Sequence, residues 1–210
     1  MKTEDLIRVL ATDGPRPVRS IDRTLLMALL VGVLVSALSF VVLRPRPDFA
    51  QALLTVPFVL KLLIVISLAG TATLFLAETA RPIPVTRRPW SLLVAPALLL
   101  GGVMVELARF PASEWTTRLI GHNAAHCLSL IPLLSLPPLV CLAFALRQGA
   151  PSRPALAGAT AGLVSGATAA SLYAITCPDD SPLFVATWYS IATFIVVVVG
   201  YFAGDRLLRW

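Results

Sequence analysis

The sequence is poor in charged residues and in cysteine. Asp, Glu, Lys and Arg make up only 13% of its 210 residues, whereas globular domains carry about 25%. Three cysteines are too few for a disulfide-stapled secreted module, and a hydrophobic content of 57% excludes a disordered chain or a nucleic-acid-binding arm. The mean hydropathy of +0.84 is typical of a membrane protein. The net charge of +6 is therefore read as a record of membrane topology.

Motifs of the common enzyme classes are also absent. The sequence has no nucleotide-binding glycine loop, no H-E-x-x-H zinc motif and no nucleophile–base combination. It has no C-x-x-C pair, which gives little support to a disulfide oxidoreductase. The connectors between the hydrophobic segments are too short to hold a folded domain. We therefore expect a protein that is not an enzyme.

Six hydrophobic segments approach the length of about 20 residues that a helix needs to cross a bilayer core. They predict an all-α, polytopic membrane protein with six transmembrane helices. An N-terminal segment, residues 1–23, precedes a helical bundle, residues 24–210. The predicted spans are residues 24–43, 57–77, 91–108, 126–146, 155–176 and 184–203.

Basic residues predict the direction in which these spans run. Twelve lysines and arginines fall in the two terminal segments and in the connectors that share their side, against four in the opposite connectors. Positive charge accumulates on the cytoplasmic side of membrane proteins. We therefore expect both termini to be cytoplasmic.

Small residues recur every fourth position in the predicted fifth span, at Gly158, Gly162, Gly166 and Ala170. Because helices in lipid gain little by hiding apolar surface from each other, such residues mark a face of close helix contact. If the helix continued to Cys177, that thiol would lie on the same face. The stripe predicts helix packing.

The predicted fourth span contains three prolines, Pro132, Pro137 and Pro138. Each removes a backbone donor, so the helix is expected to be kinked. The kink is interpreted either as a bend that fits the bundle or as a hinge between its two ends.

Two ionisable residues, Lys61 and Glu106, lie at outer-leaflet depth in the predicted topology. Charges inside a membrane are costly and are usually paired, so a Lys61–Glu106 pair is one interpretation. Lys61 could instead extend to the interface, and Glu106 could pair with Arg109. A further interpretation is that Lys61 and Glu106 lie on a transport route.

Cys127 and Cys177 lie at the predicted extracytoplasmic boundary, whereas Cys141 lies about 21 Å deeper along the fourth span. Only the first two can approach each other within one chain. Three interpretations of this pair stay open: a structural disulfide, a redox-switched thiol pair, and a metal site. In the last, His122 and His126 would join the thiolates in a set that suits zinc, cadmium or copper.

The first residues predict a short amphipathic helix with a capping hydroxyl, acidic residues in the first turn and an apolar stripe. So short a helix is not stable alone in water. It therefore lies on membrane lipid or docks into the groove of a cytoplasmic protein. The residues that we expect to bind such a partner are Thr3, Glu4, Asp5, Leu6, Ile7 and Leu10.

Several of these segments occur together, in order, in one known family. The sequence resembles the NrsF-type membrane anti-sigma factors over nearly its whole length. The segments that carry the resemblance are residues 1–7 (MKTEDLI), 149–151 (GAP), Gly158 with Gly162, 173–178 (YAITCP), 188–189 (WY) and 204–210 (GDRLLRW).

The resemblance implies a regulator in the bacterial inner membrane that holds an extracytoplasmic-function sigma factor at its cytoplasmic face. It further implies that Cys127 and Cys177 respond to heavy-metal or oxidative stress and release that factor. No cofactor is required, apart from transient zinc, cadmium or copper at the thiols, and no direct contact with nucleic acid is expected. Cys141 is additional to the pattern. The alternative is a small transporter or metal-exporter subunit.

Overall fold

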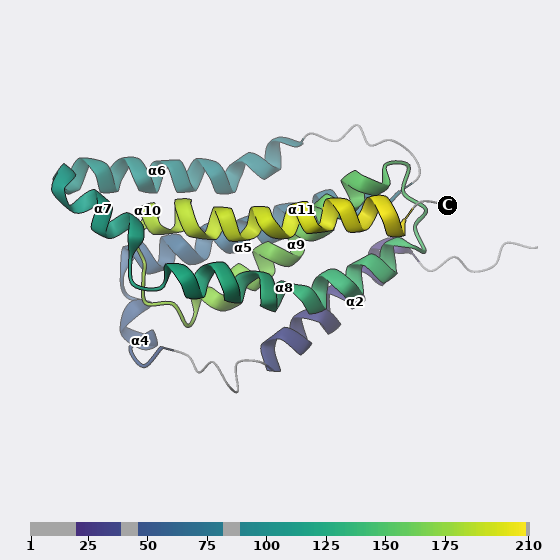
Figure 1. Ribbon diagram of the computed structural model, residues 1–210, viewed down its shortest axis with the longest axis horizontal. Coiled ribbons are helices and arrows are strands. Elements are labelled where there is room, and N and C mark those ends of the chain that lie inside the picture. The colour runs from purple at the N-terminus through teal and green to yellow at the C-terminus, as the bar shows by residue number, and fades with distance from the viewer. Residues whose placement is uncertain (1–19, 39–45, 82–88, 209–210) are drawn as a thin grey trace, which may run out of the picture.

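The computed structural model describes residues 20–38, 46–81 and 89–208, and within them the regular secondary structure is all helical (Figure 1). Six helical segments are long and apolar enough to cross a membrane. They comprise α2 (Ile21–Leu38), α5 (Val56–Thr79), η1 (Pro89–Leu93) with α6 (Val94–Arg109), α7 (Ala112–Ile120) with α8 (Ala124–Leu146), α9 (Pro154–Ala174), and α10 (Pro182–Phe184) with η2 (Val185–Tyr189) and α11 (Ser190–Leu207). The prediction of an all-α chain with six such helices is confirmed.

The helix boundaries follow local sequence signals. A proline stands in the first two positions of α5, α9 and α10, where the missing N–H costs nothing. Ser181 caps α10 by accepting a hydrogen bond from the Phe184 N–H. These signals start the last span earlier than predicted. The fifth helix ends at Ala174, so Cys177 lies beyond it.

The two ends of the bundle are formed by different helices and loops. One end, here called the cysteine end, holds α4 (Phe49–Ala52), α7, α10 and the loop of residues 175–181, and these elements lie together in Figure 1. The opposite end, here called the terminal end, holds the start of α2, the ends of α5 and α11, and residues 147–153.

Helix α9 is the central helix, with 61% of its most apolar stretch buried. Its small residues lie against α11. A Cβ atom built on Gly158 would lie 2.6 Å from the Cα atom of Gly204, and one on Gly162 would lie 2.9 Å from the Cα atom of Val197. Gly166 faces Thr193 in the same way. Only glycine allows the two backbones to approach so closely.

The prolines of α8 do not break that helix, which runs from Ala124 to Leu146. Pro138 cannot donate a hydrogen bond to the carbonyl of Leu134, so that buried acceptor needs another donor. The hydroxyl of Ser36 on α2 supplies it, 2.7 Å away. Gly32 on α2 packs directly on the Pro138 ring. The proline therefore fixes where α2 docks on α8.

Candidate sensor site at the cysteine end

The two cysteines predicted to lie at one boundary are buried in the same cluster of side chains. Cys127 lies in the first turn of α8 and Cys177 lies three residues beyond α9, with exposed fractions of 0% and 1%. Both are free thiols and share their cluster with Tyr173 and Tyr189. Cys141, also a free thiol, is only partly buried and lies further along α8. The fold thus brings the predicted pair into one site.

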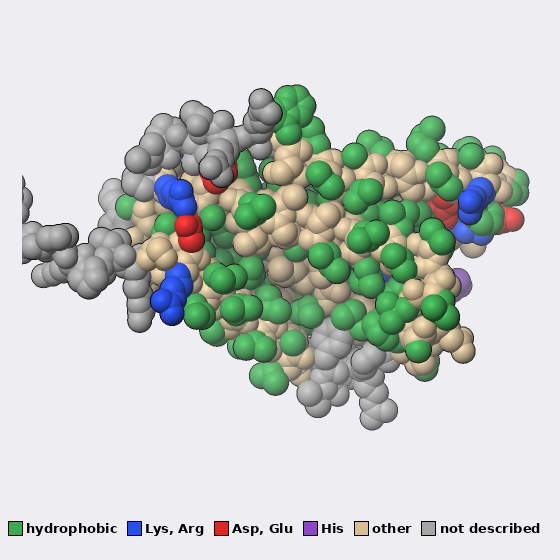
Figure 2. Space-filling model, turned by 180° about the vertical axis from the view of Figure 1, so that it is seen from behind, with side chains coloured by type: hydrophobic (Ala, Val, Ile, Leu, Met, Phe, Trp, Pro, Cys, Tyr) green, Lys and Arg blue, Asp and Glu red, His purple; other side chains and the backbone are tan. Residues whose placement is uncertain are grey.

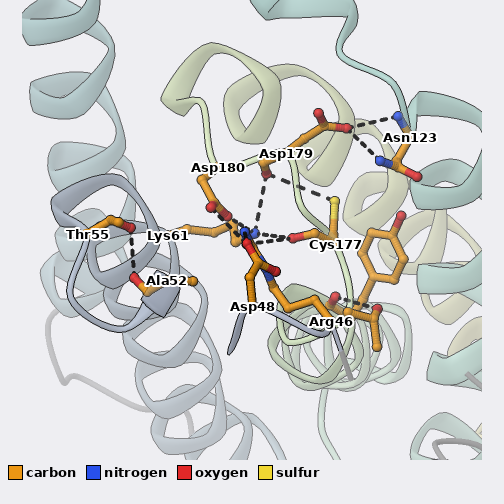
Figure 3. A network of polar contacts seen from close by, with 11 residues as sticks. Arg46, Asp48, Ala52, Thr55, Lys61, Asn123, Cys177, Asp179 and Asp180 are labelled. Carbon is orange, nitrogen blue, oxygen red and sulfur yellow. Dashed lines mark hydrogen bonds and ion pairs between the residues drawn. The ribbon is translucent and has the colours of Figure 1, made fainter. Parts of the chain in front are cut away.

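The loop that carries Cys177, residues 175–181, is held by a buried ammonium group on α5. Lys61 Nζ donates a hydrogen bond of 2.9 Å to the carbonyl oxygen of Cys177 and one of 3.3 Å to that of Asp179 (Figure 3). The Lys61 side chain is fully buried. Because a buried charge is costly unless it is paired and hydrogen-bonded, these contacts bind the loop firmly to α5.

Lys61 also forms an ion pair with the carboxylate of Asp180, at 2.5 Å. The same carboxylate lies 2.8 Å from the guanidinium of Arg46, which pairs in turn with Asp48 at 2.6 Å. Lys61 and Arg46 both lie near the ring of Phe58, at 5.2 and 5.4 Å from its centroid, an arrangement that favours cations. The four charges compensate one another in one network, drawn in Figure 3.

Glu106 on α6 belongs to a separate set of contacts. Its carboxylate accepts hydrogen bonds from the Ser181 hydroxyl at 2.8 Å and from the Leu183 N–H at 2.9 Å. It also pairs with Arg118 of α7 at 3.3 Å. The predicted Lys61–Glu106 pair is thus replaced by two others, because the Cys177 loop inserts its own acid beside Lys61. Glu106 likewise pairs with Arg118 in place of Arg109.

Asp179 ties the Cys177 loop to the start of the helix that carries Cys127. One carboxylate oxygen of Asp179 accepts hydrogen bonds from the backbone N–H groups of His122 and Asn123, at 3.1 and 2.9 Å. The same oxygen accepts a third from the Asn123 side chain at 3.0 Å. Asn123 is the residue immediately before α8. A displacement of either cysteine therefore acts on the same carboxylate.

The predicted metal site with two histidines is not assembled. The side chain of His122 is 89% exposed and only approaches Asp179, with 3.7 Å between Nδ1 and Oδ1. His126 is exposed although Cys127 beside it is buried, since neighbouring residues on a helix point about 100° apart. Within the described residues, no three His, Cys, Asp or Glu side chains are arranged to hold a metal ion. Any metal bound by the two thiols would have to find further ligands elsewhere.

Burial opposes ionisation of the Cys177 thiol, whereas Arg46 favours ionisation of the exposed Asp48 carboxylate. Burial raises the pKa of Cys177, and the neighbouring Lys61 counteracts part of that effect. The hydrogen bond from Arg46 lowers the pKa of Asp48 to about 2, and the same bond raises the pKa of Arg46. Cys177 is therefore protonated at neutral pH, and Lys61 is the group that most favours its thiolate.

Sequence reasoning missed the residues that hold the loop, namely Arg46, Asn123, Arg118, Asp179 and Asp180. A usable signal existed, because Asp179 and Asp180 lie two and three residues after Cys177 and share the predicted side of Lys61. The positions proposed to bind a partner, Thr3, Glu4, Asp5, Leu6, Ile7 and Leu10, lie outside the described residues.

Comparison with known proteins identifies the family. A family model described as "NrsF: Negative regulator of sigma F" matches residues 10–210. The "Anti-sigma-F factor NrsF" of Caulobacter vibrioides is 35% identical, and the "Probable anti-sigma-F factor NrsF" of Azospira oryzae is 32% identical. Each alignment covers the whole of both chains. No solved structure matches the chain significantly.

These relatives confirm the resemblance seen in the sequence, and with it the expectation that the protein is not an enzyme. A match over residues 10–210 and two full-length relatives above 30% identity leave one assignment. The chain belongs to the NrsF family of negative regulators of sigma F.

Proposed function

We propose that this protein is an anti-sigma factor of the bacterial inner membrane. Its cytoplasmic face binds an extracytoplasmic-function sigma factor, and a heavy-metal or oxidative signal at Cys127 and Cys177 releases that factor. The observation that carries the proposal is the burial of two thiols in one cluster, Cys127 on α8 and Cys177 on a loop that is bonded to α5, α6 and the start of α8. The relatives' printed names support the sigma-factor partner.

The signal is proposed to join the two sulfur atoms. Hydrogen peroxide would oxidise both thiols to a disulfide; the two electrons and two protons that the thiols give up reduce it to two molecules of water. A soft cation such as cadmium would instead bind both thiolates and release two protons. Both routes end with Cys127 and Cys177 linked, directly or through the metal.

Linking the sulfurs disturbs the contacts of the Cys177 loop. The Cys177 carbonyl is held by Lys61, and the Asp179 carboxylate is held by the residues that precede α8. A small movement of this loop strains these charge-assisted hydrogen bonds, and the bond from the buried Lys61 is the costliest to lose. The loop therefore has two alternative arrangements, one for separate thiols and one for linked thiols.

Helix α5 is the proposed route to the cytoplasmic face. It begins near the loop, carries Lys61 in its second turn and runs for 24 residues, or about 36 Å at 1.5 Å per residue. At its far end, Thr79 hydrogen-bonds Thr160 of α9 at 3.0 Å, and the Ala80 carbonyl lies against Gly149. The predicted partner-binding residues, which lie between Thr3 and Leu10, precede α2 in the sequence, and α2 starts at that same terminal end.

The energies of the two signals can be compared with the free energy that such a switch needs. Changing a two-state ratio from 1:99 to 99:1 requires about 5.5 kcal/mol. A disulfide contributes about 2–4 kcal/mol, which shifts such a ratio only in part, whereas a structural zinc with a full set of ligands contributes about 10–16 kcal/mol. Metal binding is therefore expected to release the partner more completely than oxidation does.

The test uses the full chain in lipid nanodiscs with its bound sigma factor. Cadmium or peroxide should release the sigma factor from the native protein, whereas Cys127→Ser and Cys177→Ser proteins should retain it. Cys141→Ser is the matched control and should respond like the native protein. Retention by the native protein, or release from the double Cys127→Ser, Cys177→Ser variant, would contradict the proposal. Solute flux in proteoliposomes without any sigma-factor binding would favour the transporter alternative.

A further inference from the structure

A hollow of about 680 Å³ lies between α5 and α6 near the cysteine end. Its volume falls within the range of about 300–1,000 Å³ that is typical of ligand pockets. Most of its wall is apolar, and the polar residues gather at one end. The lining residues are Val56, Pro57, Leu60, Ala97, Leu98, Gly101, Gly102, Val105, Glu106, Arg109, Phe110, Arg118, Asp180, Ser181 and Pro182.

Helix α6 borders the hollow and is buried along only one narrow face, which includes Ala95, Gly102 and Glu106. Its most apolar stretch is only 11% buried, the smallest share among the six spans, and Figure 1 shows the helix along the edge of the bundle. Gly102 contacts Leu60 and Pro182 at the cysteine end, whereas a Cβ atom on Gly101 would meet no atom within 4 Å. The two helices are thus separated along an apolar groove.

The acidic groups at the mouth of the groove have cationic partners, and Arg118 pairs with both Glu106 and Glu114. Glu106 pairs with Arg118, and Asp180 pairs with Lys61. Arg109 is exposed and forms no ion pair with any described residue. In Figure 2, charged side chains gather at the two ends of the molecule, one of which is the α6–α7 end, and hydrophobic side chains lie between them. The mouth therefore presents one guanidinium free to bind an anion.

We propose that this groove binds one phospholipid, with an acyl chain between α5 and α6 and the headgroup phosphate on Arg109. The apolar wall suits a hydrocarbon chain, and the free guanidinium suits a phosphate. Arg109 is the last residue of the apolar helix α6, so it lies at the depth where a headgroup would sit beside a chain inserted along that helix.

The bound lipid would touch the sensor site. Ser181 and Asp180 line the groove and also belong to the loop that carries Cys177. An acyl chain in the groove supports α6 against this loop and favours the arrangement in which Glu106 accepts its hydrogen bonds from Ser181 and Leu183. Lipid binding itself does not depend on the proposed anti-sigma activity.

The experiment measures lipid bound to the full chain by native mass spectrometry, with phosphatidylglycerol and with diacylglycerol of the same chains. Gly101→Phe fills the groove and should lower binding of both lipids about tenfold. Gly70→Phe is the matched control, because Gly70 on α5 is also exposed with no atom within 4 Å of an added Cβ and does not line the groove; it should bind both lipids normally.

Arg109→Gln separates the headgroup from the chain and leaves the exposed end of α6 folded. It should weaken phosphatidylglycerol binding about fivefold, in line with one lost contact to a phosphate, and leave diacylglycerol binding unchanged. Equal lipid binding by the native, Gly101→Phe and Gly70→Phe proteins would overturn the proposal, as would the absence of bound lipid on the native protein. An unchanged phosphatidylglycerol affinity in Arg109→Gln would overturn its headgroup part.

Discussion

The α9–α11 contact and the cysteine end stabilise the same bundle by different means. The first is built on glycine against glycine, with backbone atoms in direct contact. The second is built on buried charges, in which Lys61, Asp180 and Arg46 satisfy one another. A glycine interface holds no group that a chemical signal can alter, whereas a network beside two thiols does. The bundle therefore combines a rigid helix pair, α9 with α11, and a cysteine end that can change state.

Replacing a glycine of the α9–α11 contact by a larger residue should give the largest loss of stability. In Gly158→Leu, the added side chain overlaps the backbone of α11 around Gly204, and the cost is expected to be about 3 kcal/mol or more. The free energy of unfolding in detergent micelles measures it. Gly70→Leu is the matched control, because Gly70 has open space around it. Similar stabilities of the two variants would show that the α9–α11 contact tolerates a larger residue as well as an exposed position does.

Removing the buried ammonium should be the next largest effect. Lys61→Met leaves Asp180 with Arg46 alone and deprives two loop carbonyls of their donor, at an expected cost of about 3 kcal/mol. The double variant Lys61→Met, Asp180→Asn should recover part of that loss, because it removes the uncompensated carboxylate. Unfolding measurements on both proteins test this, and an equal or larger loss in the double variant would contradict the pairing.

Ser36→Ala tests a contact outside both regions, between α2 and α8. The change leaves the Leu134 carbonyl, freed by Pro138, without its donor, and a buried unsatisfied acceptor costs about 1–3 kcal/mol. Ser129→Ala is the control, since the Ser129 hydroxyl is exposed and bonds only to its own helix. If the two variants unfold at the same denaturant concentration, the Ser36 contact does not fix the docking of α2.

The smallest effect concerns Asp48, which is exposed. Its pKa is lowered from 3.8 to about 2 by Arg46, so the ionised form stabilises the fold above pH 4 and that contribution is lost as the pH falls toward 2. Between pH 5 and 2, the native protein should lose slightly more stability than Asp48→Asn. Unfolding titrations at these pH values measure the difference, and a steeper loss in Asp48→Asn would reverse the sign.

Hydropathy and small-residue spacing were sufficient to predict the helices and the contact face of α9, because both depend on local composition. The pairing of Lys61 was not predicted, since it depends on how residues 177–181 fold back over α5. The prediction that His122 and His126 join the thiols as metal ligands was wrong for a similar reason. Their spacing placed His122 and His126 on one helical face, but α8 begins at Ala124 and turns His126 away from the buried Cys127.

The central claim is that the state of Cys127 and Cys177 changes the terminal end of the bundle through α5. Hydrogen exchange of the full chain in nanodiscs, measured with and without cadmium, tests it most directly. The account predicts faster exchange at residues 76–81 and 147–153 in the native protein and no change in the Cys127→Ser, Cys177→Ser variant. Cadmium bound at both thiols, as counted by intact mass, with unchanged exchange at those segments would contradict it.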